Sequence, residues 1–312
     1  MIHFILNTSG GRGKAAKRWE KVRTYMEKNG IEFIPHHTNY KGEASVIAEK
    51  ISSESGNADI IIIGGDGTIN EVINGLRDFS KIRLGVIPAG SGNDFARELK
   101  IKKHAPVKTL RKILSNIENN SSQKIDLGRT TFTDESGEAK SKLFAISSGF
   151  GLDAEVCRKV DISKLKTFLN RIHAGKLSYT IETVISLFSM KTFSLSAEFD
   201  DGEKKDFTKA IFFSSMNFKC QGGGVKFAPG AIADDGKLSL CAVSEVAKIR
   251  TFFLLPFIVK GWHKIFKCFY FKDFKRVQAV CNTEAVLHTD GEVFTGVKEF
   301  SVELAEEKLC II

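Results

Sequence analysis

The sequence predicts two domains, an α/β domain with a parallel sheet at the N-terminus and then a domain rich in β-strands. The run from Ile60 to Ile63 has no polar alternation, which is typical of a parallel strand covered by helices on both faces. Up to about residue 120, strand patterns alternate with helical patterns, which is the order expected of a parallel α/β sheet. Beyond that point the alternation stops, and short strands separated by turn residues follow.

Four strand-and-helix units make up the predicted N-terminal domain, which we place at residues 1–122. Strands are expected at residues 2–6, 31–37, 59–63 and 82–88, and helices at 14–28, 43–54, 68–76 and near 94–99. Residues 123–296 form the predicted second domain, and the C-terminal segment, about residues 297–312, is expected to pack back on the first.

The central apolar run ends in a glycine-rich loop of the kind that holds phosphate. Gly64, Gly65 and Gly67 let the backbone turn sharply and bring its N–H groups close to a ligand, and a helix beginning near Thr68 points its N-terminus into the loop. Asp66 would repel a bare polyphosphate, so it suggests that a divalent cation, Mg²⁺, accompanies the phosphates. The other interpretation of this stretch is an Asp-Gly turn without a ligand.

Two further loops follow predicted strands of the same sheet. Residues 7–13 are rich in glycine but lack the Gly-Lys-Ser/Thr of a Walker loop. They fit a dinucleotide fingerprint only loosely, because the acidic residue near the right distance, Glu32, opens the second strand instead of closing it. Residues 89–94 end in Asn93 and Asp94 at a helix start, so their backbone donors are expected to face the same ligand.

The second domain is expected to contain strands at residues 191–200, 206–216, 277–289 and 298–304, with one or two helices in residues 163–190. Two Asp-Gly turns, at residues 232–238 and 290–292, carry carboxylates. An exposed hairpin turn explains the first of them as well as a ligand site does.

Composition limits the partners of this chain of 312 residues. Its 46 Lys and Arg against 37 Asp and Glu give a net charge of +9, which favours nucleotide, nucleic acid or an anionic membrane surface. Nucleic acid is disfavoured, because the basic residues are dispersed without an aromatic stacking pattern. No run of 18 apolar residues and no signal peptide are found, so a cytoplasmic protein, peripheral at the membrane, is expected.

Residues 246–266 form a helix-like stretch rich in Phe and Trp among basic residues. Two interpretations stay open, a face buried in the core and a face that lies in a membrane interface.

Four motifs taken together, GGDGTINEVINGL, GVIPAGSGNDFAREL, DDGKL and TDGE, resemble the diacylglycerol kinase catalytic family. Within it the chain is similar to soluble bacterial lipid kinases, with sphingosine kinases further off and NAD kinases more remote. The resemblance covers nearly the whole chain. It implies a first domain similar to NAD kinases and phosphofructokinases, a β-sandwich second domain, and an active site with ATP in the cleft between them.

The resemblance also implies which residues contact the nucleotide. Each lies in a loop or helix start at the carboxyl end of a predicted strand. They are Asn7, Thr8, Ser9, Gly10, Gly11, Thr38, Gly64, Gly65, Asp66, Gly67, Thr68, Asn70, Glu71, Gly90, Ser91, Gly92 and Asn93. One departure is Thr8, which stands where relatives usually have proline and so loses rigidity but no donor.

The resemblance assigns Glu292 as the general base that accepts the proton of a lipid hydroxyl, and Asp66 as the group at the cation on the γ-phosphate. Asp94 with Arg12 or Lys14 is expected to complete the charge network. Some relatives hold a second, structural Mg²⁺ at the corresponding Asp-Gly turn, and the resemblance implies such a metal site at residues 232–238 of this chain. Its ligands are Asp235 and the main-chain oxygens of Ile232 and Lys237.

The predicted function is that of an ATP-dependent lipid kinase that converts diacylglycerol to phosphatidic acid in phospholipid biosynthesis, at an anionic membrane surface. The alternatives are a kinase for a sphingoid base or another lipid alcohol, an NAD kinase, and a silent nucleotide-binding regulator. The intact set of Asp66, Asp94 and Glu292 argues against a silent protein. The oligomeric state stays open, with a homodimer as one alternative.

Overall fold

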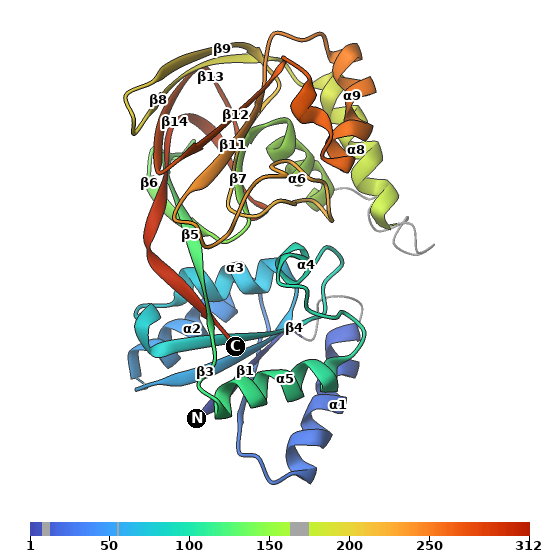
Figure 1. The fold of residues 1–312 in the computed structure, drawn as a ribbon, viewed down its shortest axis with the longest axis vertical. Coiled ribbons are helices and arrows are strands. Elements are labelled where there is room, and N and C mark those ends of the chain that lie inside the picture. Colours follow the sequence, from blue (N-terminus) through green and yellow to red (C-terminus); the bar gives the residue numbers. More distant parts are fainter. Residues whose placement is uncertain (8–12, 55, 163–174) are drawn as a thin grey trace. The chain divides into compact units, whose positions relative to one another are not determined.

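The computed structural model describes residues 1–7, 13–54, 56–162 and 175–312, which fall into two compact units (Figure 1). The first unit comprises Met1–Leu127 with Glu306–Ile312, and the second comprises Gly128–Ala305. The sequence suggested a break after residue 122 and a returning segment from about residue 297. The returning segment is shorter because the last strand, β14 (Glu292–Ile311), pairs within the second unit over most of its length.

The first unit is built on a parallel sheet, as predicted. Its strands are, in order across the sheet, β2 (Ile34–His37), β1 (Ile2–Leu6), β3 (Ala58–Gly64) and β4 (Ile82–Pro88). Near the end of β14, Cys310 and Ile311 add a short parallel pairing to β4. All seven residues of β3 are buried, because helices cover both faces of this inner strand.

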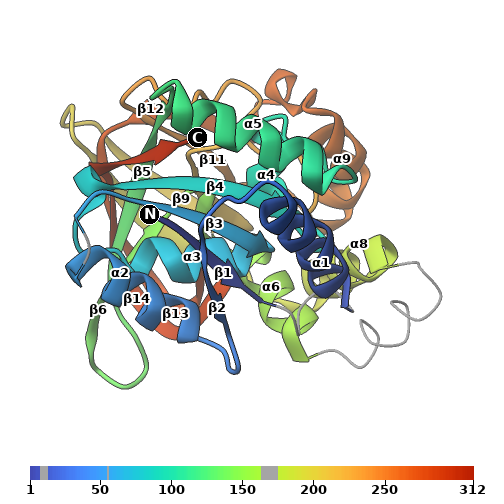
Figure 2. The same ribbon diagram turned by 90° about the horizontal axis from the view of Figure 1, so that it is seen from below.

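Helices lie on both faces of this sheet (Figure 2). They are α1 (Lys14–Lys28), α2 (Glu43–Glu54), α3 (Asp66–Gly75), α4 (Asp94–Glu98) and α5 (Pro106–Glu118). Helices α1 and α5 share one core with Ile61 and Ile63 of β3. Helices α2 and α3 pack against each other, and Gly75 permits their close approach. A Cβ atom at Gly75 would lie 2.1 Å from the carbonyl oxygen of Ser45.

The second unit is β-rich, which confirms the predicted fold class. Antiparallel strands run in the order β12, β11, β10, β7, β13 and β14, while β8 pairs with β13 and β9, and β5 pairs with β14 and β6. Their bounds are β5 (Gln123–Thr133), β6 (Ala139–Phe144), β7 (Ser147–Gly151), β8 (Phe193–Phe199), β9 (Lys204–Ala210), β10 (Phe212–Met216), β11 (Leu238–Val243), β12 (Phe269–Phe274) and β13 (Arg276–Thr289). The core between them is rich in phenylalanine.

In the part of the second unit that the structure describes, the strands are accompanied by three helices and a short 3₁₀ turn. They are α6 (Leu152–Ile162), α8 (Gly175–Ser189), α9 (Lys248–Lys260) and η3 (His263–Ile265). Part of the helical region predicted at residues 163–190, residues 163–174, lies outside the described residues. Among the helices that the structure describes, none is long and apolar enough to cross a membrane.

Candidate active site

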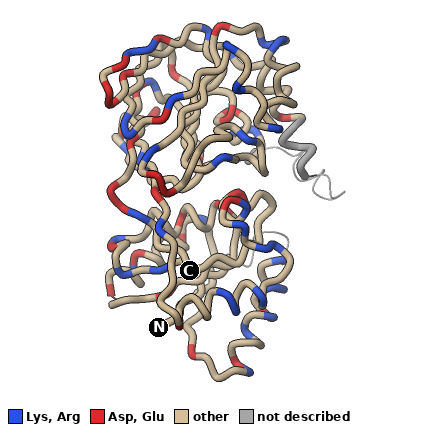
Figure 3. The backbone as a smooth tube through the Cα atoms, in the orientation of Figure 1, with Lys and Arg blue, Asp and Glu red and all other residues tan. Residues whose placement is uncertain are grey.

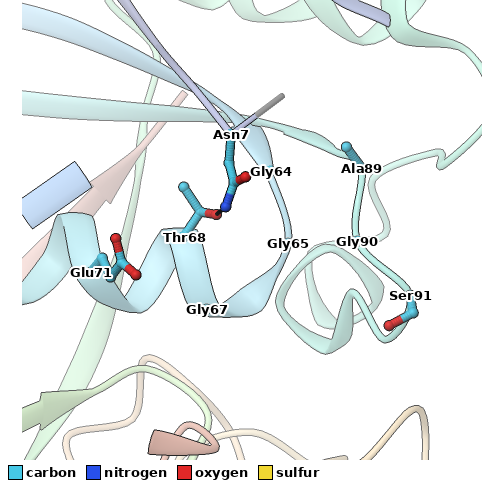
Figure 4. Close-up of a pocket in the computed structure, with 9 residues that line it drawn as sticks. All are labelled: Asn7, Gly64, Gly65, Gly67, Thr68, Glu71, Ala89, Gly90 and Ser91. Atoms are coloured by element: carbon cyan, nitrogen blue, oxygen red, sulfur yellow. Dashed lines mark hydrogen bonds between the residues drawn. The ribbon is translucent and has the colours of Figure 1, made fainter. Parts of the chain in front are cut away.

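A pocket of about 260 Å³ lies at the carboxyl ends of β1, β3 and β4 (Figure 4). Asn7, which directly follows β1, lines it together with residues of α3 and of the loops after β3 and β4. Four glycines and one alanine among the lining residues leave the backbone accessible. The lining residues are Asn7, Gly64, Gly65, Gly67, Thr68, Glu71, Ala89, Gly90 and Ser91. The carboxyl edge of a parallel sheet is where folds of this type bind ligands.

Glycine is required where the loops after β3 and β4 cross. A Cβ atom on Gly90 would lie 2.7 Å from the Cα atom of Gly65, and a Cβ atom on Gly64 would lie 2.8 Å from Oγ1 of Thr68. The backbone N–H of Ala89 also donates to the carbonyl oxygen of Gly64 at 2.6 Å. The two loops are therefore in direct backbone contact and form one continuous wall.

Polar side chains from β1 and α3 meet in this pocket. The Nδ2 of Asn7 donates to Oγ1 of Thr68 at 3.1 Å, and Glu71 lies one turn further along α3 (Figure 4). Gly67 and Thr68 belong to the first turn of α3, so the N-terminus of this helix is at the pocket. The positive end of the helix dipole and the exposed loop amides together favour a bound phosphate.

Asp66 is not among the lining residues but joins the two crossing loops. Its Oδ2 accepts from the N–H of Asp94 at 3.1 Å and its Oδ1 accepts from the N–H of Phe95 at 3.2 Å, so the carboxylate caps the N-terminus of α4. Burial raises the pKa of Asp66, while these hydrogen bonds and the charge of Arg97 act in the opposite direction. The structure thus gives this residue a structural contact that the sequence analysis did not anticipate.

Asp94 is buried and forms an ion pair with Arg97. Asp94 also lies close to Asp66. The space beside the two carboxylates is open because residue 92 is glycine and has no side chain. A Cβ atom on Gly92 would lie 3.1 Å from Oδ2 of Asp66 and 3.7 Å from Oδ2 of Asp94. The structure therefore brings together the two carboxylates that the resemblance assigned to the charge network.

This pair of carboxylates suits Mg²⁺, a hard cation that takes oxygen ligands and is commonly held by one or two carboxylates plus substrate phosphates. The part of the chain that the structure describes contains no group of three or more His, Cys, Asp and Glu side chains placed to hold a metal. Cation binding at Asp66 and Asp94 would therefore depend on oxygens from the nucleotide.

The other predicted nucleotide contacts divide into three groups. Thr38 lies outside the pocket lining, and its hydroxyl donates to the carbonyl oxygen of Leu6 at 3.3 Å. Asn70 is buried in α3, whereas Asn93 holds the loop after β4 by donating to the carbonyl oxygen of Gly90 at 2.7 Å. Thr8, Ser9, Gly10, Gly11 and Arg12 lie outside the described residues.

Lys14, the first residue of α1, is exposed and does not line the phosphate pocket. It lies in a shallower depression with Lys17, Arg18, Lys21 and His104. Asp94 forms an ion pair with Arg97 of its own helix. Arg12, the other basic residue expected in the charge network, lies outside the described residues, so the part of Arg12 or Lys14 in that network stays a prediction.

Glu292, the predicted general base, is the first residue of β14 and is partly exposed. Its carboxylate pairs with Nζ of Lys142 on β6 at 3.2 Å. The same Nζ lies 5.8 Å from the ring centroid of Phe294. Lys142 was not singled out from the sequence, since it is 150 residues away and no motif surrounds it.

Asp290 holds the turn before Glu292 in place by hydrogen bonds. Its carboxylate accepts from the N–H groups of Ala145, Ile146 and Ser147 at 2.8, 2.9 and 2.9 Å. Asp290 adopts a left-handed conformation with φ of 48°. The aspartate of the Asp-Gly-Glu motif thus anchors the turn that carries the glutamate.

A buried cluster behind this turn was also missed from the sequence. The N–H of Gly291 donates to Nδ1 of His288 at 3.3 Å, so Nδ1 is the acceptor and Nε2 carries the proton. Nε2 faces Oδ2 of Asp153 at 3.4 Å, and Nε2 of Gln221 donates to the same oxygen at 3.2 Å. Asp153 is 135 residues from His288, which left no local signal.

Asp235 lies in an exposed turn, where its Oδ1 accepts from the N–H of Lys237 at 3.1 Å. This geometry is that of an ordinary Asx turn. Ile232, whose main-chain oxygen was assigned to the same metal, has an exposed side chain.

Comparison with known proteins agrees with this arrangement. Residues 1–130 match the diacylglycerol kinase catalytic domain, and residues 146–310 match the YegS C-terminal NAD kinase beta sandwich-like domain. The chain is 28% identical over 293 residues to the Bacillus subtilis (strain 168) protein named "Putative lipid kinase YtlR", covering 93% of this chain and 92% of the relative. It is 29% identical over 290 residues to the diacylglycerol kinase of the same organism, covering 93% and 88%.

A solved structure is also similar, the "putative diacylglycerol kinase" of Bacillus anthracis str. Sterne, with a TM-score of 0.74 at 21% identity. The match covers 100% of this chain and 94% of that one, and it shows the shared fold. From the two family matches and the curated relatives, the chain belongs to the diacylglycerol kinase catalytic family and is a lipid kinase, with ATP as the substrate that this family implies.

Proposed function

We propose that this lipid kinase transfers the γ-phosphoryl group of ATP to the hydroxyl of diacylglycerol and so produces phosphatidic acid. The observation that carries the proposal is the pocket at the N-terminus of α3, which lies at the ends of three parallel strands and is lined by four glycines. The diacylglycerol kinases among its relatives support this acceptor.

In this proposal the first unit holds the triphosphate. The backbone of Gly65, Gly67 and Gly90 can approach the phosphate oxygens closely because these residues have no side chain. The N-terminus of α3 adds a positive partial charge directed at the same place. Asn7 and Thr68, which are hydrogen-bonded to each other, add polar side chains to the lining of the pocket.

Asp66 and Asp94 are the proposed ligands of the cation that accompanies the nucleotide. When bound, Mg²⁺ neutralises charge on the transferring phosphate. The two side chains have different partners, since Asp66 caps α4 and Asp94 pairs with Arg97. Each carboxylate is therefore oriented before any ligand arrives, which reduces the cost of ordering the site.

Glu292 is the proposed general base. A lipid hydroxyl has a pKa far above 7, so its proton must be accepted as the new P–O bond forms. During the transfer, the hydroxyl oxygen forms a bond to the γ-phosphorus while the bond from this phosphorus to the bridging oxygen breaks. ADP leaves, and the hydroxyl proton passes to Glu292. Lys142 orients this carboxylate through their ion pair.

The acceptor is tested by incubating the purified chain with γ-labelled ATP, Mg²⁺ and, in separate reactions, dispersed diacylglycerol, sphingosine, monoacylglycerol and NAD. Label is expected in phosphatidic acid. Label in the phosphorylated sphingoid base would replace the acceptor and keep the lipid kinase, whereas label only in NADP would refute the proposal. Absence of transfer to every acceptor, with ATP still bound, would identify a silent nucleotide-binding protein.

A further inference from the structure

Helix α9 is apolar on both its inner and its outer side. The inner side contributes Thr251, Leu254 and Ile258 to the buried part of the second unit. On the outer side, Ile249 and Phe253 have 56% and 65% of their surface exposed. A helix that is apolar all round is normally buried in a core or in a membrane, and between Arg250 and Lys260 the outer side of α9 lacks the charged residues expected against water.

The exposed apolar surface continues beyond α9. Helix α8 lies beside it (Figure 1), and the rings of Phe188 and Phe252 are 6.1 Å apart. After α9, Trp262 is 63% exposed and Ile265 is 76% exposed. Of the thirteen exposed large hydrophobic residues in the described part of the chain, seven belong to this surface. We call it the α8–α9 face, and it comprises Ile185, Phe188, Ile249, Phe253, Val259, Trp262 and Ile265.

Basic residues outnumber acidic ones along the α8–α9 face. No Asp or Glu occurs from residue 246 to residue 272, nor from residue 183 to residue 197, and Glu182 and Glu245 stand at the borders of these stretches. Figure 3 marks Lys and Arg in blue and Asp and Glu in red along the backbone. The cations in and beside α9 are Lys248, Arg250, Lys260, Lys264 and Lys267. Such a distribution complements an anionic partner along the whole length of the face.

We propose that the α8–α9 face docks on an anionic lipid bilayer, with its apolar side chains in the interfacial region and its cations among the head groups. Contiguous exposed apolar surface marks an interaction site, and Trp262 at its border is the residue type most favoured at a membrane interface. Basic residues near an anionic surface add electrostatic attraction to the burial of the apolar side chains. The core interpretation of residues 246–266 holds for the buried side of the helix, and the interface interpretation is what we propose for the exposed side.

Trp262 supplies a probe within the face itself. The chain contains two tryptophans, and Trp19 is only 5% exposed, in the first unit. Vesicles of phosphatidylcholine, alone or mixed with phosphatidylglycerol, are added to the full chain without nucleotide. With anionic vesicles, the Trp262 emission should shift to shorter wavelength and be quenched by brominated acyl chains. Because ATP is absent, this readout is independent of the proposed acceptor.

Two matched pairs of variants localise the binding. Phe253→Ser should weaken vesicle binding at least about tenfold, whereas Val280→Ser, at an exposed position in β13, should leave it unchanged. Replacing Arg250, Lys260 and Lys267 together by Glu should also weaken vesicle binding. The charge-matched control reverses exposed residues on α1 and α5, namely Lys28, Lys108 and Lys112. Lys264 is left unchanged, because its Nζ packs near Gly230 and the Phe271 ring.

Turnover on short-chain dispersed diacylglycerol should stay within about twofold of wild type in every α8–α9 variant, which also shows that the variants are folded. Equal binding to neutral and anionic vesicles would overturn the proposal. So would equal loss of binding in the control variants, or a dimer that shields Trp262 before vesicles are added. Higher salt should weaken binding, as expected for an electrostatic contribution.

Discussion

At the residue scale, Asp66 combines two roles that place different demands on its charge. As a cap it accepts two backbone N–H groups of α4, which an ionised carboxylate does well. Burial disfavours that same ionised form, and it raises the pKa of the group. Without a bound cation the charge therefore costs stability at neutral pH, as is common for groups held ready for ligand binding.

Asp66→Asn tests this cost through the pH dependence of unfolding. Because the folded-state pKa lies above the ordinary value of 3.8, the folded protein binds this proton more tightly than the unfolded chain does. The contribution of Asp66 to stability is thus fully present below pH 3.8 and is lost as pH rises through the raised pKa. The free energy of unfolding of wild type minus that of the Asn variant should fall as pH rises above 3.8 and through the raised pKa of Asp66.

The measurement is urea unfolding without Mg²⁺ or nucleotide, followed by Trp19 fluorescence in a Trp262→Phe background, so that only the first unit is observed. A difference that rises with pH would show that the cap interactions, and not burial, dominate the titration of Asp66.

At the scale of elements, the sequence predicts those parts of the fold that local patterns determine. The apolar run of β3 and the glycines after it are sufficient to predict a buried strand that ends in a glycine-rich loop, and the structure shows both. Phosphate binding by this loop stays a prediction. The contacts that hold Glu292 in place are different. They join β6, β13 and α6, far apart in sequence, so only the folded chain reveals them.

Two glycines of α3 should respond to alanine in opposite ways. Gly75→Ala places a methyl group against the carbonyl of Ser45, and such overpacking costs about 1 to 3 kcal/mol. Gly67→Ala meets no atom within 4 Å, so better helix propensity should stabilise the unit by up to about 1 kcal/mol. Gly67 lines the pocket, however, and its variant should bind ATP more weakly. Chemical denaturation and calorimetry measure the two effects, and similar stabilities of the two variants would contradict the proposed packing.

The His288 cluster should act on turnover by positioning the turn before Glu292. Asn at residue 288 can replace Nδ1 as the acceptor for the Gly291 N–H, whereas Gln replaces Nε2 facing Asp153 instead. We therefore expect kcat to fall by more than about tenfold, or 1.4 kcal/mol, in His288→Gln and by less in His288→Asn, with KM for ATP unchanged in both. Equal losses in both variants, or a raised KM for ATP, would show general destabilisation instead.

At the scale of the whole molecule, each unit supplies a different part of the proposed chemistry. The first contributes the phosphate pocket and the pair Asp66 and Asp94, and the second contributes Glu292 and the α8–α9 face. The family motifs allow the pocket, the pair Asp66 and Asp94, and Glu292 to be predicted from the sequence. Composition suggests membrane binding but does not indicate which side of α9 is exposed, because an evenly apolar helix has no pattern that distinguishes its sides.

A structural metal ion at Asp235, if it binds as predicted, should affect the stability of the folded chain. Mg²⁺ that binds only the folded protein raises the melting temperature by mass action. Thermal melts without nucleotide should show an Mg²⁺-dependent shift in wild type that is absent in Asp235→Ala and kept in the control Asp234→Ala. If wild type shows no shift, Asp235 serves only in the Asx turn that the structure shows.

We propose a working kinase whose first unit binds the nucleotide and whose second unit supplies the base. Transfer of labelled phosphate from ATP to diacylglycerol in a single turnover measures both functions together. Wild type should transfer the label, and Glu292→Gln should bind ATP normally by calorimetry but transfer at least about 100-fold more slowly, a barrier increase of about 2.7 kcal/mol. Asp66→Asn should be slowed to a similar extent. Transfer by Glu292→Gln within about threefold of wild type would contradict the assignment of the base, and failure of wild type to transfer at all would contradict the proposal itself.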